Sequence, residues 1–189
     1  NAKAWLHIQD FEVEAFFGLG FSSGGFVKKC VNAVEGWLMR RFDRVSSISR
    51  QMVARLADFG IPENRTSIFP NWVDTDRIRP GARGRAFREE WGLGPDRKIV
   101  LYAGSMGNKQ GLEMVLETAR AMQNDDPDSL FLLVGEGSAK EGLVHRTREL
   151  GLRNVLFKPP QSPEDFPALL TLADVHLVVQ KTGVAEAFM

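Results

Sequence analysis

The sequence predicts an α/β fold with parallel sheets, and three observations support this prediction. From Lys98 onward, short aliphatic or β-branched runs alternate with amphipathic stretches, which is the pattern of parallel strands joined by crossover helices. Glycine-bearing turns directly follow two of these runs. The first third has strands and helices in a different order, and a stretch rich in Gly, Pro and Arg at residues 77–85 separates it from the rest. We therefore expect two units with a junction at this stretch.

The part of the chain after the junction predicts strands and helices in alternation. The strands are expected at residues 99–103, 130–134, 155–157 and 175–179, and the helices at residues 112–122, 139–150 and 163–172. Ser162 and Pro163 suit the cap and the first turn of the last helix. Gly151 follows the middle helix at the position of a C-cap glycine.

The part before the junction predicts fewer elements. We expect strands at residues 5–9 and 44–48, a long helix at residues 26–42, a second helix that ends at Phe59, and a strand within residues 66–74 that runs into a turn. Ser49 suits the cap of the second helix, and Gly60 suits its end. The sequence has no internal repeat or low-complexity tract, which excludes solenoids and disordered tails.

Composition and charge exclude several classes of protein. Of the 189 residues, 43% are hydrophobic, which is enough for a sizeable core. The 24 Lys and Arg residues balance the 24 Asp and Glu residues, so nucleic acid is not an expected partner. A single thiol, Cys30, excludes a disulfide framework and a structural zinc site made of cysteines, and it fits a reducing compartment.

The start of the sequence resembles neither a leader nor a membrane anchor. The first residue is Asn1, and neither a basic segment nor an apolar signal region follows, so we expect the chain to begin inside a longer one. The charge-free run at residues 15–27 has about half the length of a membrane-spanning helix, which needs roughly 20 apolar residues, and it contains four glycines. We expect no segment to cross a membrane.

Residues 104–111 form a glycine-rich turn between an expected strand and an expected helix. Main-chain amides converge at such a helix start and favour an anion, and glycine lets the main chain approach a ligand closely. Lys109 adds a positive charge on a flexible side chain. No Gly-Lys-Ser/Thr follows, so this is not a Walker A loop. The pattern is that of a phosphate site, and a tightly packed turn that binds nothing is the alternative.

Gly135, Glu136 and Gly137 repeat this arrangement after the next expected strand. Turns after successive parallel strands meet at the carboxyl edge of a sheet, where open α/β folds bind ligands. The spacing also begins a Gly-x-Gly-x-x-Gly pattern, but Lys140 occupies its last position and no acidic residue lies beside Phe157. The two turns together predict an anion site and argue against a dinucleotide fingerprint.

Other acidic residues and histidines are better explained by structure than by metal binding. Asp74 and Asp76 form an Asp-x-Asp pair that would suit a divalent ion on a nucleotide sugar, but two carboxylates in a turn are more often caps. The remaining candidates are the acidic loop Asp125, Asp126 and Asp128, the pair Glu141 and Glu149, and the isolated His145 and His176. We expect no metal site among them.

His7 and Asp10 are a histidine and an aspartate placed together at the end of an expected strand. A histidine in this place can act on a substrate hydroxyl or phosphate, because its pKa lies near neutral pH. From spacing alone, a hydrogen-bonded histidine under a loop is the favoured interpretation.

The expected helix at residues 26–42 combines an apolar stripe with basic neighbours. The stripe consists of Val27, Val31, Val34, Leu38 and Phe42, and such a stripe usually faces a core. Basic side chains are in excess nearby, at Lys28, Lys29, Arg40, Arg41, Arg44, Arg50 and Arg55, and Phe16, Phe17, Leu19 and Phe21 lie upstream. Contact with an anionic membrane surface is therefore the alternative.

Three stretches, taken in order, resemble those of family 4 retaining glycosyltransferases. They are residues 7–14, residues 45–49 leading to residues 69–76, and residues 102–113 with residues 133–137. Residues 70–74 are similar to the Pro-Asn-Gly-Val-Asp signature that closes the acceptor-side domain, with Trp72 where glycine is usual. The resemblance covers nearly the whole chain and is to the group 1, GT-B type, especially its colanic-acid and exopolysaccharide branch.

The resemblance implies an α/β, GT-B-like fold with two Rossmann-type parallel-sheet domains, both incomplete in this chain. Residues 1–78 are then the C-terminal part of the acceptor-side domain, and residues 79–189 are the truncated donor-side domain. The implied substrate is a nucleotide-diphosphate sugar, bound with no cofactor and no required metal. The implied site residues are His7 and Asp10 for catalysis, Gly104, Ser105, Gly107 and Lys109 for the diphosphate, and Gly135, Glu136, Gly137, Phe157 and Lys158 in the donor-binding loops.

The resemblance further implies transfer of a hexose, with retention, to a saccharide or lipid-linked acceptor in extracellular polysaccharide biosynthesis. The implied location is cytoplasmic or peripheral on the inner face of the membrane. Two features depart from the family: Ser105 replaces an Arg that many relatives carry, and no partner follows Glu186 at the spacing of the Glu-x7-Glu element. The alternatives are a non-catalytic or truncated nucleotide-sugar-binding homologue and, from another class, a nicotinamide-dependent oxidoreductase.

Overall fold

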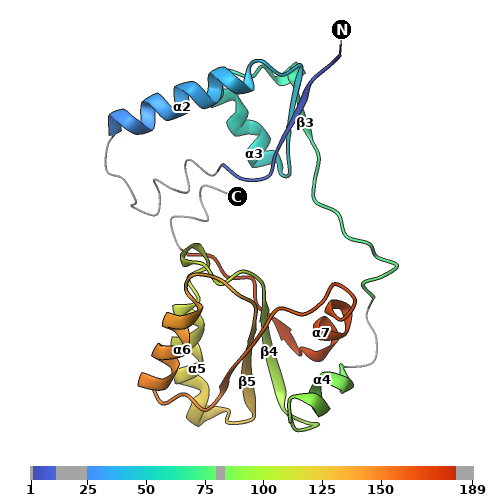
Figure 1. Ribbon diagram of the computed structural model, residues 1–189, viewed down its shortest axis with the longest axis vertical. Coiled ribbons are helices and arrows are strands. Elements are labelled where there is room, and N and C mark those ends of the chain that lie inside the picture. The colour runs from blue at the N-terminus through green and yellow to red at the C-terminus, as the bar shows by residue number, and fades with distance from the viewer. Residues whose placement is uncertain (1, 12–24, 80–83, 182–189) are drawn as a thin grey trace. The chain divides into compact units, whose positions relative to one another are not determined.

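The computed structural model of the chain describes residues 2–11, 25–79 and 84–181. These residues divide into two compact units, with the boundary between Trp72 and Val73. Each unit is built on its own parallel sheet flanked by helices (Figure 1). The predicted α/β class with parallel sheets is confirmed. The assignment of residues 1–78 and 79–189 to an acceptor side and a donor side stays a prediction.

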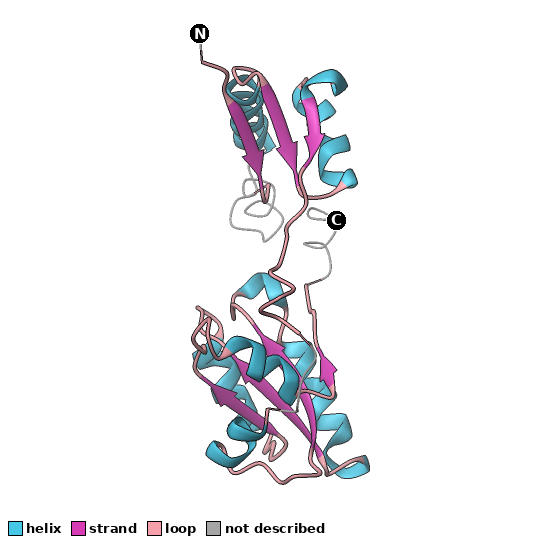
Figure 2. Cartoon of the chain, turned by 90° about the vertical axis from the view of Figure 1, so that its right-hand side faces the viewer, coloured by secondary structure: helices cyan, strands magenta, loops and turns pink. Residues whose placement is uncertain are grey.

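The first unit holds a three-stranded sheet in the order β1-β2-β3, with all strands parallel (Figure 2). Its elements are β1 (Trp5–Ile8), α2 (Gly25–Met39), β2 (Arg44–Ser47), α3 (Arg50–Arg55), the 3₁₀ helices η1 (Leu56–Phe59) and η2 (Glu63–Arg65), and β3 (Thr66–Ile68). One buried cluster joins the sheet to α2, α3 and η1, and Phe11, Val45, Met52 and Leu56 form its fully buried centre.

Two local signals in the first unit act as the sequence predicts. The Ser49 hydroxyl accepts a hydrogen bond from the Met52 amide at 3.1 Å and so caps α3. Gly60 ends the following turn in the left-handed conformation, with φ of 75°. The helix expected to run to Phe59 tightens into η1 at Leu56, so the cap and the end are right while the last turn is 3₁₀.

The prediction that the apolar stripe of the long helix faces the core is wrong for Val34 and Leu38. Their exposed fractions are 58% and 51%, and the buried face of α2 instead carries Gly36 and Met39. A Cβ at Gly36 would lie 3.2 Å from the Phe59 carbonyl, so the smallest residue sets the contact of α2 with η1. The helix also ends at Met39, before Phe42.

Membrane contact by this basic helix stays a prediction. Four upstream residues that contribute to it lie outside the described residues: Phe16, Phe17, Leu19 and Phe21. Glu186, considered above for the Glu-x7-Glu element, also lies outside them. Within the described ranges, we find no helix that is both long and apolar enough to span a bilayer.

The second unit holds a four-stranded parallel sheet in the order β6-β5-β4-β7. Its elements are α4 (Arg85–Glu90), β4 (Lys98–Ala103), the 3₁₀ helix η3 (Asn108–Gln110), α5 (Glu113–Asp125), β5 (Ser129–Val134), α6 (Lys140–Glu149), β6 (Val155–Lys158), α7 (Phe166–Leu172) and β7 (Val175–His176). Every residue of β5 is buried, as expected for a central strand covered on both faces.

Two hydrophobic clusters cover the two faces of this sheet. On one face, Leu116 of α5 and Leu143 of α6 pack against Phe131 and Leu133. On the other face, α4 and α7 pack against Ile99, Leu101, Leu130 and Leu132, with Leu169 and Leu172 fully buried. This arrangement is visible in Figure 1, where α5 and α6 lie together and α4 and α7 lie on the other side.

The structure corrects two expectations for this unit and adds one helix. The last helix begins at Phe166 and not at Pro163, because Ser162 caps a preceding turn, in which its hydroxyl accepts from the Asp165 amide at 3.1 Å. β7 ends at His176, three residues early. Helix α4 was not expected, because its apolar pair Phe87 and Trp91, with ring centroids 4.6 Å apart, follows the Gly- and Pro-rich junction.

Candidate nucleotide-binding site

The two glycine-bearing turns start level with each other at the carboxyl edge of the second sheet. In the parallel register, Ala103 at the end of β4 lies opposite Val134 at the end of β5, and Val134 lies opposite Lys158 of β6. We call residues 104–107 the first corner and residues 135–139 the second corner. Both corners therefore leave the sheet at the edge where open α/β folds bind ligands.

The two corners are joined by main-chain hydrogen bonds. The Gly104 amide donates to the Val134 carbonyl at 3.0 Å, and the Met106 amide donates to the Glu136 carbonyl at 2.8 Å. The Ala139 amide returns a bond to the Met106 carbonyl at 2.9 Å. The corners thus form one rigid rim rather than two separate loops.

Glycine is required in the second corner because the first corner lies directly against it. A Cβ at Gly135 would lie 1.9 Å from the Gly104 carbonyl oxygen, and a Cβ at Gly137 would lie 2.4 Å from the Met106 carbonyl oxygen. Real Cβ atoms do not approach backbone atoms so closely. Close contact with the first corner therefore explains why both positions are glycine. The same contact joins the two corners into one surface, which we call the wall.

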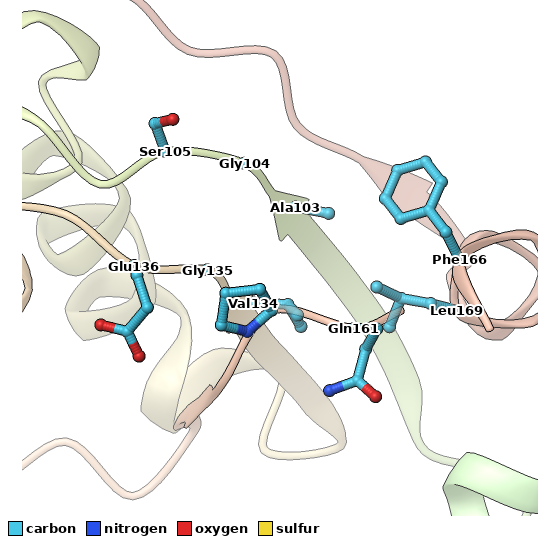
Figure 3. A pocket seen from close by; sticks show the side chains of 10 residues that line it. Ala103, Gly104, Ser105, Val134, Gly135, Glu136, Gln161, Phe166 and Leu169 are labelled. Atoms are coloured by element: carbon cyan, nitrogen blue, oxygen red, sulfur yellow. The ribbon is translucent and has the colours of Figure 1, made fainter. Parts of the chain in front are cut away.

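A cavity of about 440 Å³ opens beside this wall. Its lining residues come from the ends of β4 and β5, the two corners, the loop after β6 and helix α7: Ala103, Gly104, Ser105, Val134, Gly135, Glu136, Pro160, Gln161, Phe166 and Leu169. Phe166 and Leu169 form an apolar side near the ends of β4 and β5 (Figure 3). The volume lies in the range of small-molecule sites, about 300–1,000 Å³.

The main-chain donors at the wall are fewer than a whole glycine-rich loop would offer. The Met106 amide is bonded to Glu136, and the Gly107 amide donates to the Gln110 side chain at 3.0 Å. The amides of Ser105 and Glu136 have no hydrogen-bond acceptor among the described residues. These two amides, one from each corner, are therefore available to an anion.

Tyr102 holds the first corner in place from within the sheet. Its hydroxyl donates to the Ser105 carbonyl at 2.6 Å. Burial raises the pKa of Tyr102 above its ordinary value, so the hydroxyl keeps its proton and remains a donor at neutral pH. This hydrogen bond fixes the Ser105 carbonyl and so orients the peptide bond between Ser105 and Met106 in the first corner.

Four of the residues predicted for the donor site line the cavity, and the other five are not among its described lining residues. Gly104, Ser105, Gly135 and Glu136 belong to the lining. Gly107 and Gly137 lie in the two corners, next to the lining residues. Lys109 lies in η3, where its carbonyl accepts from the Lys181 amide at 2.9 Å, and it is not among the described lining residues.

The loop after β6 reaches the cavity through different residues from those predicted. Phe157 packs against the cluster under α5 and α6. The Lys158 ammonium lies 5.1 Å from the centre of the Trp91 ring. Pro160 and Gln161, two and three residues further on, line the cavity instead. The Pro159-Pro160 pair directly after a strand was the signal that sequence reasoning passed over.

Sequence reasoning also missed the position of Lys140, which it used only as evidence against a dinucleotide fingerprint. The Lys140 ammonium donates to the Gly135 carbonyl at 3.1 Å and bonds the carboxylate of Glu136. Both partners line the cavity. Lys140, like Lys109, is not among the described lining residues, but its ammonium bonds two residues that are.

His7 lies in the first unit beside a second, more apolar cavity of about 320 Å³ lined by Trp5, His7, Ser46 and Phe69. Nδ1 of His7 lies 2.8 Å from the Ser46 hydroxyl, and Nε2 lies 3.0 Å from the Gln9 amide nitrogen. Because an amide nitrogen only donates, these partners assign the proton of the neutral ring to Nδ1.

Asp10 lies exposed directly after β1, next along the chain from Gln9. The Phe69 ring meets the His7 ring edge to face, with centroids 5.3 Å apart, and Trp72 lies 5.4 Å from Phe69. His7 thus combines two hydrogen bonds with an aromatic surface. Its role, like that of Asp10, stays a prediction.

The acidic groups that sequence reasoning set aside have structural partners. One carboxylate oxygen of Asp74 accepts from the amides of Asp76 and Arg77, as a turn cap does. Hydrogen bonds from Ser129 and Lys98 lower the pKa of Asp126. Glu149 pairs with Arg146 and His145. The described ranges contain no group of three or more His, Cys, Asp or Glu that would suit a metal ion.

Comparison with known proteins defines the class to which this fold and site belong. The family model for glycosyl transferases group 1 matches residues 85–188, and that for Glycosyltransferase Family 4 matches residues 17–77. The chain belongs to the group 1 glycosyltransferase family, which confirms the resemblance seen in the sequence.

Individual relatives agree with this assignment. The chain is 40% identical over its whole length to a putative colanic acid biosynthesis glycosyl transferase, WcaI, of Escherichia coli, 47% of which it covers. It is 31% identical, over 74% of its length, to a GDP-mannose-dependent phosphatidylinositol monomannoside mannosyltransferase of Mycolicibacterium smegmatis, 37% of which is covered.

Solved structures confirm the GT-B-like fold. The crystal structure of Anabaena HepE with UDP-glucose matches with a TM-score of 0.74 and 17% identity, over 93% of this chain and 46% of that one. WaaG, a glycosyltransferase involved in lipopolysaccharide biosynthesis, matches with a TM-score of 0.62 and 20% identity, over 76% and 40%. The chain spans less than half the length of each of these four relatives.

The contact between the corners predicts a large difference between two glycine substitutions. Gly135→Ala should destabilise the second unit by about 1–3 kcal/mol, because its Cβ meets the Gly104 carbonyl. Gly142→Ala, inside α6 with open space around the new Cβ, should be neutral or stabilise by up to about 1 kcal/mol. Amide hydrogen exchange in β5 measures both effects. Equal stability of the two variants would show that the corners do not touch.

Proposed function

We propose that the protein transfers a hexose from a nucleotide-diphosphate sugar to a saccharide or lipid-linked acceptor, with retention, in extracellular polysaccharide biosynthesis. In this proposal, residues 79–189 belong to the donor side and residues 1–78 to the acceptor side. The observation that carries the proposal is the cavity of about 440 Å³ at the joined corners, whose lining combines apolar side chains with Ser105 and Glu136, two residues whose amides have no acceptor in the described part of the chain.

The two halves of the cavity suit the two halves of a nucleoside diphosphate. Phe166, Leu169 and Pro160 offer an apolar surface for a base and ribose, and the Ser105 and Glu136 amides offer donors to phosphate oxygens. HepE, which shares the fold, has been crystallised with UDP and with UDP-glucose. The Escherichia coli relative is described as acting in colanic acid biosynthesis, and this supports a polysaccharide as the product.

The proposed reaction breaks the bond between the anomeric carbon of the sugar and the diphosphate. Negative charge develops on the diphosphate as this bond breaks, and donors that are already in place stabilise that charge. Each well-placed donor of this kind is worth about 3–4 kcal/mol. The rigid rim keeps the Ser105 and Glu136 amides in position before the reaction, so no metal is required in this proposal.

On the acceptor side we propose a role for His7 and Asp10. Gln9, which holds Nε2 of His7, is exposed, so a ligand hydroxyl can replace it as the partner of this nitrogen. The rings of Trp5 and Phe69 beside His7 present flat apolar faces of the kind that cover the C–H face of a sugar.

Retention of configuration rests on the family resemblance alone. In the family picture the acceptor attacks from the face that the diphosphate leaves, with a diphosphate oxygen taking the acceptor proton. An NMR spectrum of the first product formed from an α-linked donor should show an α-anomer. A β-anomer would contradict this part of the proposal.

Nucleotide binding tests the proposal directly. UDP or GDP at a hundred times its dissociation constant should stabilise the native chain by about 2.7 kcal/mol, because it binds the folded state. A thermal-shift panel of UDP, GDP, their hexose conjugates and NADH measures this, with calorimetry for the best ligand. Tighter binding of NADH would favour an oxidoreductase, and the absence of any shift with UDP, GDP and their conjugates would refute the proposal.

Substitution of His7 tests the acceptor side separately. His7→Gln should lower the rate of nucleoside diphosphate release from the best donor in that panel while leaving UDP or GDP affinity unchanged, since the donor cavity is lined by residues of the other unit. His145→Gln, an exposed histidine on α6, is the matched control and should change neither. A fall in melting temperature with no fall in rate would return His7 to a structural role. Nucleotide binding without any release in the unsubstituted protein would favour a non-catalytic homologue.

A further inference from the structure

We propose that Lys140 is a further cation that binds the diphosphate, in addition to Lys109, and that Glu136 competes with the diphosphate for it. This inference deepens the proposed function and rests on it. It assigns to Lys140 the charge that many relatives carry at the position of Ser105. It also gives the Glu136 carboxylate an opposing effect on the same ligand.

The position of Lys140 on the rim is the first step. Its ammonium bonds two lining residues at once, the Gly135 carbonyl at 3.1 Å and the Glu136 carboxylate. Its side chain is only 20% exposed, so the ammonium is held at the wall and not extended into solvent. The Lys140 amide bonds the Gly137 carbonyl at 3.1 Å, which anchors the residue to the second corner.

The charge of the wall is the second step. Ser105 is uncharged, and Glu136 is an acidic group in the lining. An unneutralised carboxylate repels a diphosphate, which carries at least two negative charges, at close range. The bond to Lys140 neutralises Glu136 in the unliganded protein. Glu136 lines the cavity, so a diphosphate at the Ser105 and Glu136 amides would lie next to this ion pair.

The exchange of partners is the third step. An ammonium has three donors, and a diphosphate oxygen is a stronger competitor than one exposed carboxylate because it brings more charge. The Glu136 side chain is 58% exposed, so it can turn to solvent when its partner leaves. The Gly135 carbonyl, which is main chain, continues to hold the ammonium at the rim.

Two substitutions at this pair are therefore expected to act in opposite directions. Lys140→Gln should weaken UDP binding by about 10- to 100-fold, the range for losing a hydrogen bond to a charged group. Glu136→Gln should strengthen it by a factor of about 3–10, because both the competitor and a like charge are removed. Lys140→Arg, which keeps the charge, should retain most of the affinity.

Uridine separates a phosphate contact from a structural role. It shares the base and ribose with UDP but carries no phosphate, so its affinity should be the same in all these variants. Lys98→Gln is the matched control, since Lys98 pairs with Asp126 at the amino end of β4, the opposite end of the same sheet. It should leave the affinity for both ligands unchanged.

Isothermal titration calorimetry of the whole chain with UDP and uridine measures these effects. Unchanged UDP affinity in Lys140→Gln would overturn the assignment and leave the proposed function intact. Equal losses for UDP and uridine would show that Lys140 only supports the corner, and would also overturn it. Weaker UDP binding in Glu136→Gln would refute the competition. If the unsubstituted chain bound neither UDP nor GDP, the proposed function itself would fail.

Discussion

The main-chain bonds between residues 104–107 and residues 135–139 are the constraint on which the site depends. Two amide-to-carbonyl contacts of 2.8 and 2.9 Å join the corners, and this close approach leaves no room for a Cβ at Gly135 or Gly137. The level register of β4 and β5 makes these contacts geometrically available. The site therefore forms because the pairing of β4 with β5 continues into the residues that follow these two strands.

The same constraint determines which groups remain for a ligand. Bonding between the corners consumes the amides of Met106 and Ala139, and Gln110 consumes that of Gly107, while the Ser105 and Glu136 amides of the cavity lining have no acceptor among the described residues. Apolar residues from α7 close the cavity beside them. A wall with few donors gains from a nearby cation, and the ammonium of Lys140 lies on its rim. The packed corners, the amides of Ser105 and Glu136 and the charge of Lys140 thus lie together at the carboxyl edge of the second sheet.

The elements could be predicted where local signals decide them. Alternating apolar runs located both sheets, and Ser49 and Gly60 marked a helix start and a stop, because caps act over a few residues. Tertiary packing decided the rest: Gly36 and not a valine stripe faces η1, and Ser162 caps a turn before α7. Sequence spacing indicated Lys109 as the phosphate cation, which stays a prediction, while the hydrogen bond from the Lys140 ammonium to the Gly135 carbonyl became visible only in the structure.

The most direct test of the account is amide hydrogen exchange with and without saturating UDP or GDP. The account predicts that the amides of Ser105 and Glu136 exchange more slowly when the nucleotide is bound, because a phosphate oxygen then accepts from donors that have no acceptor among the described residues. Protection confined to other parts of the chain, with residues 104–106 and 135–137 unchanged, would contradict it.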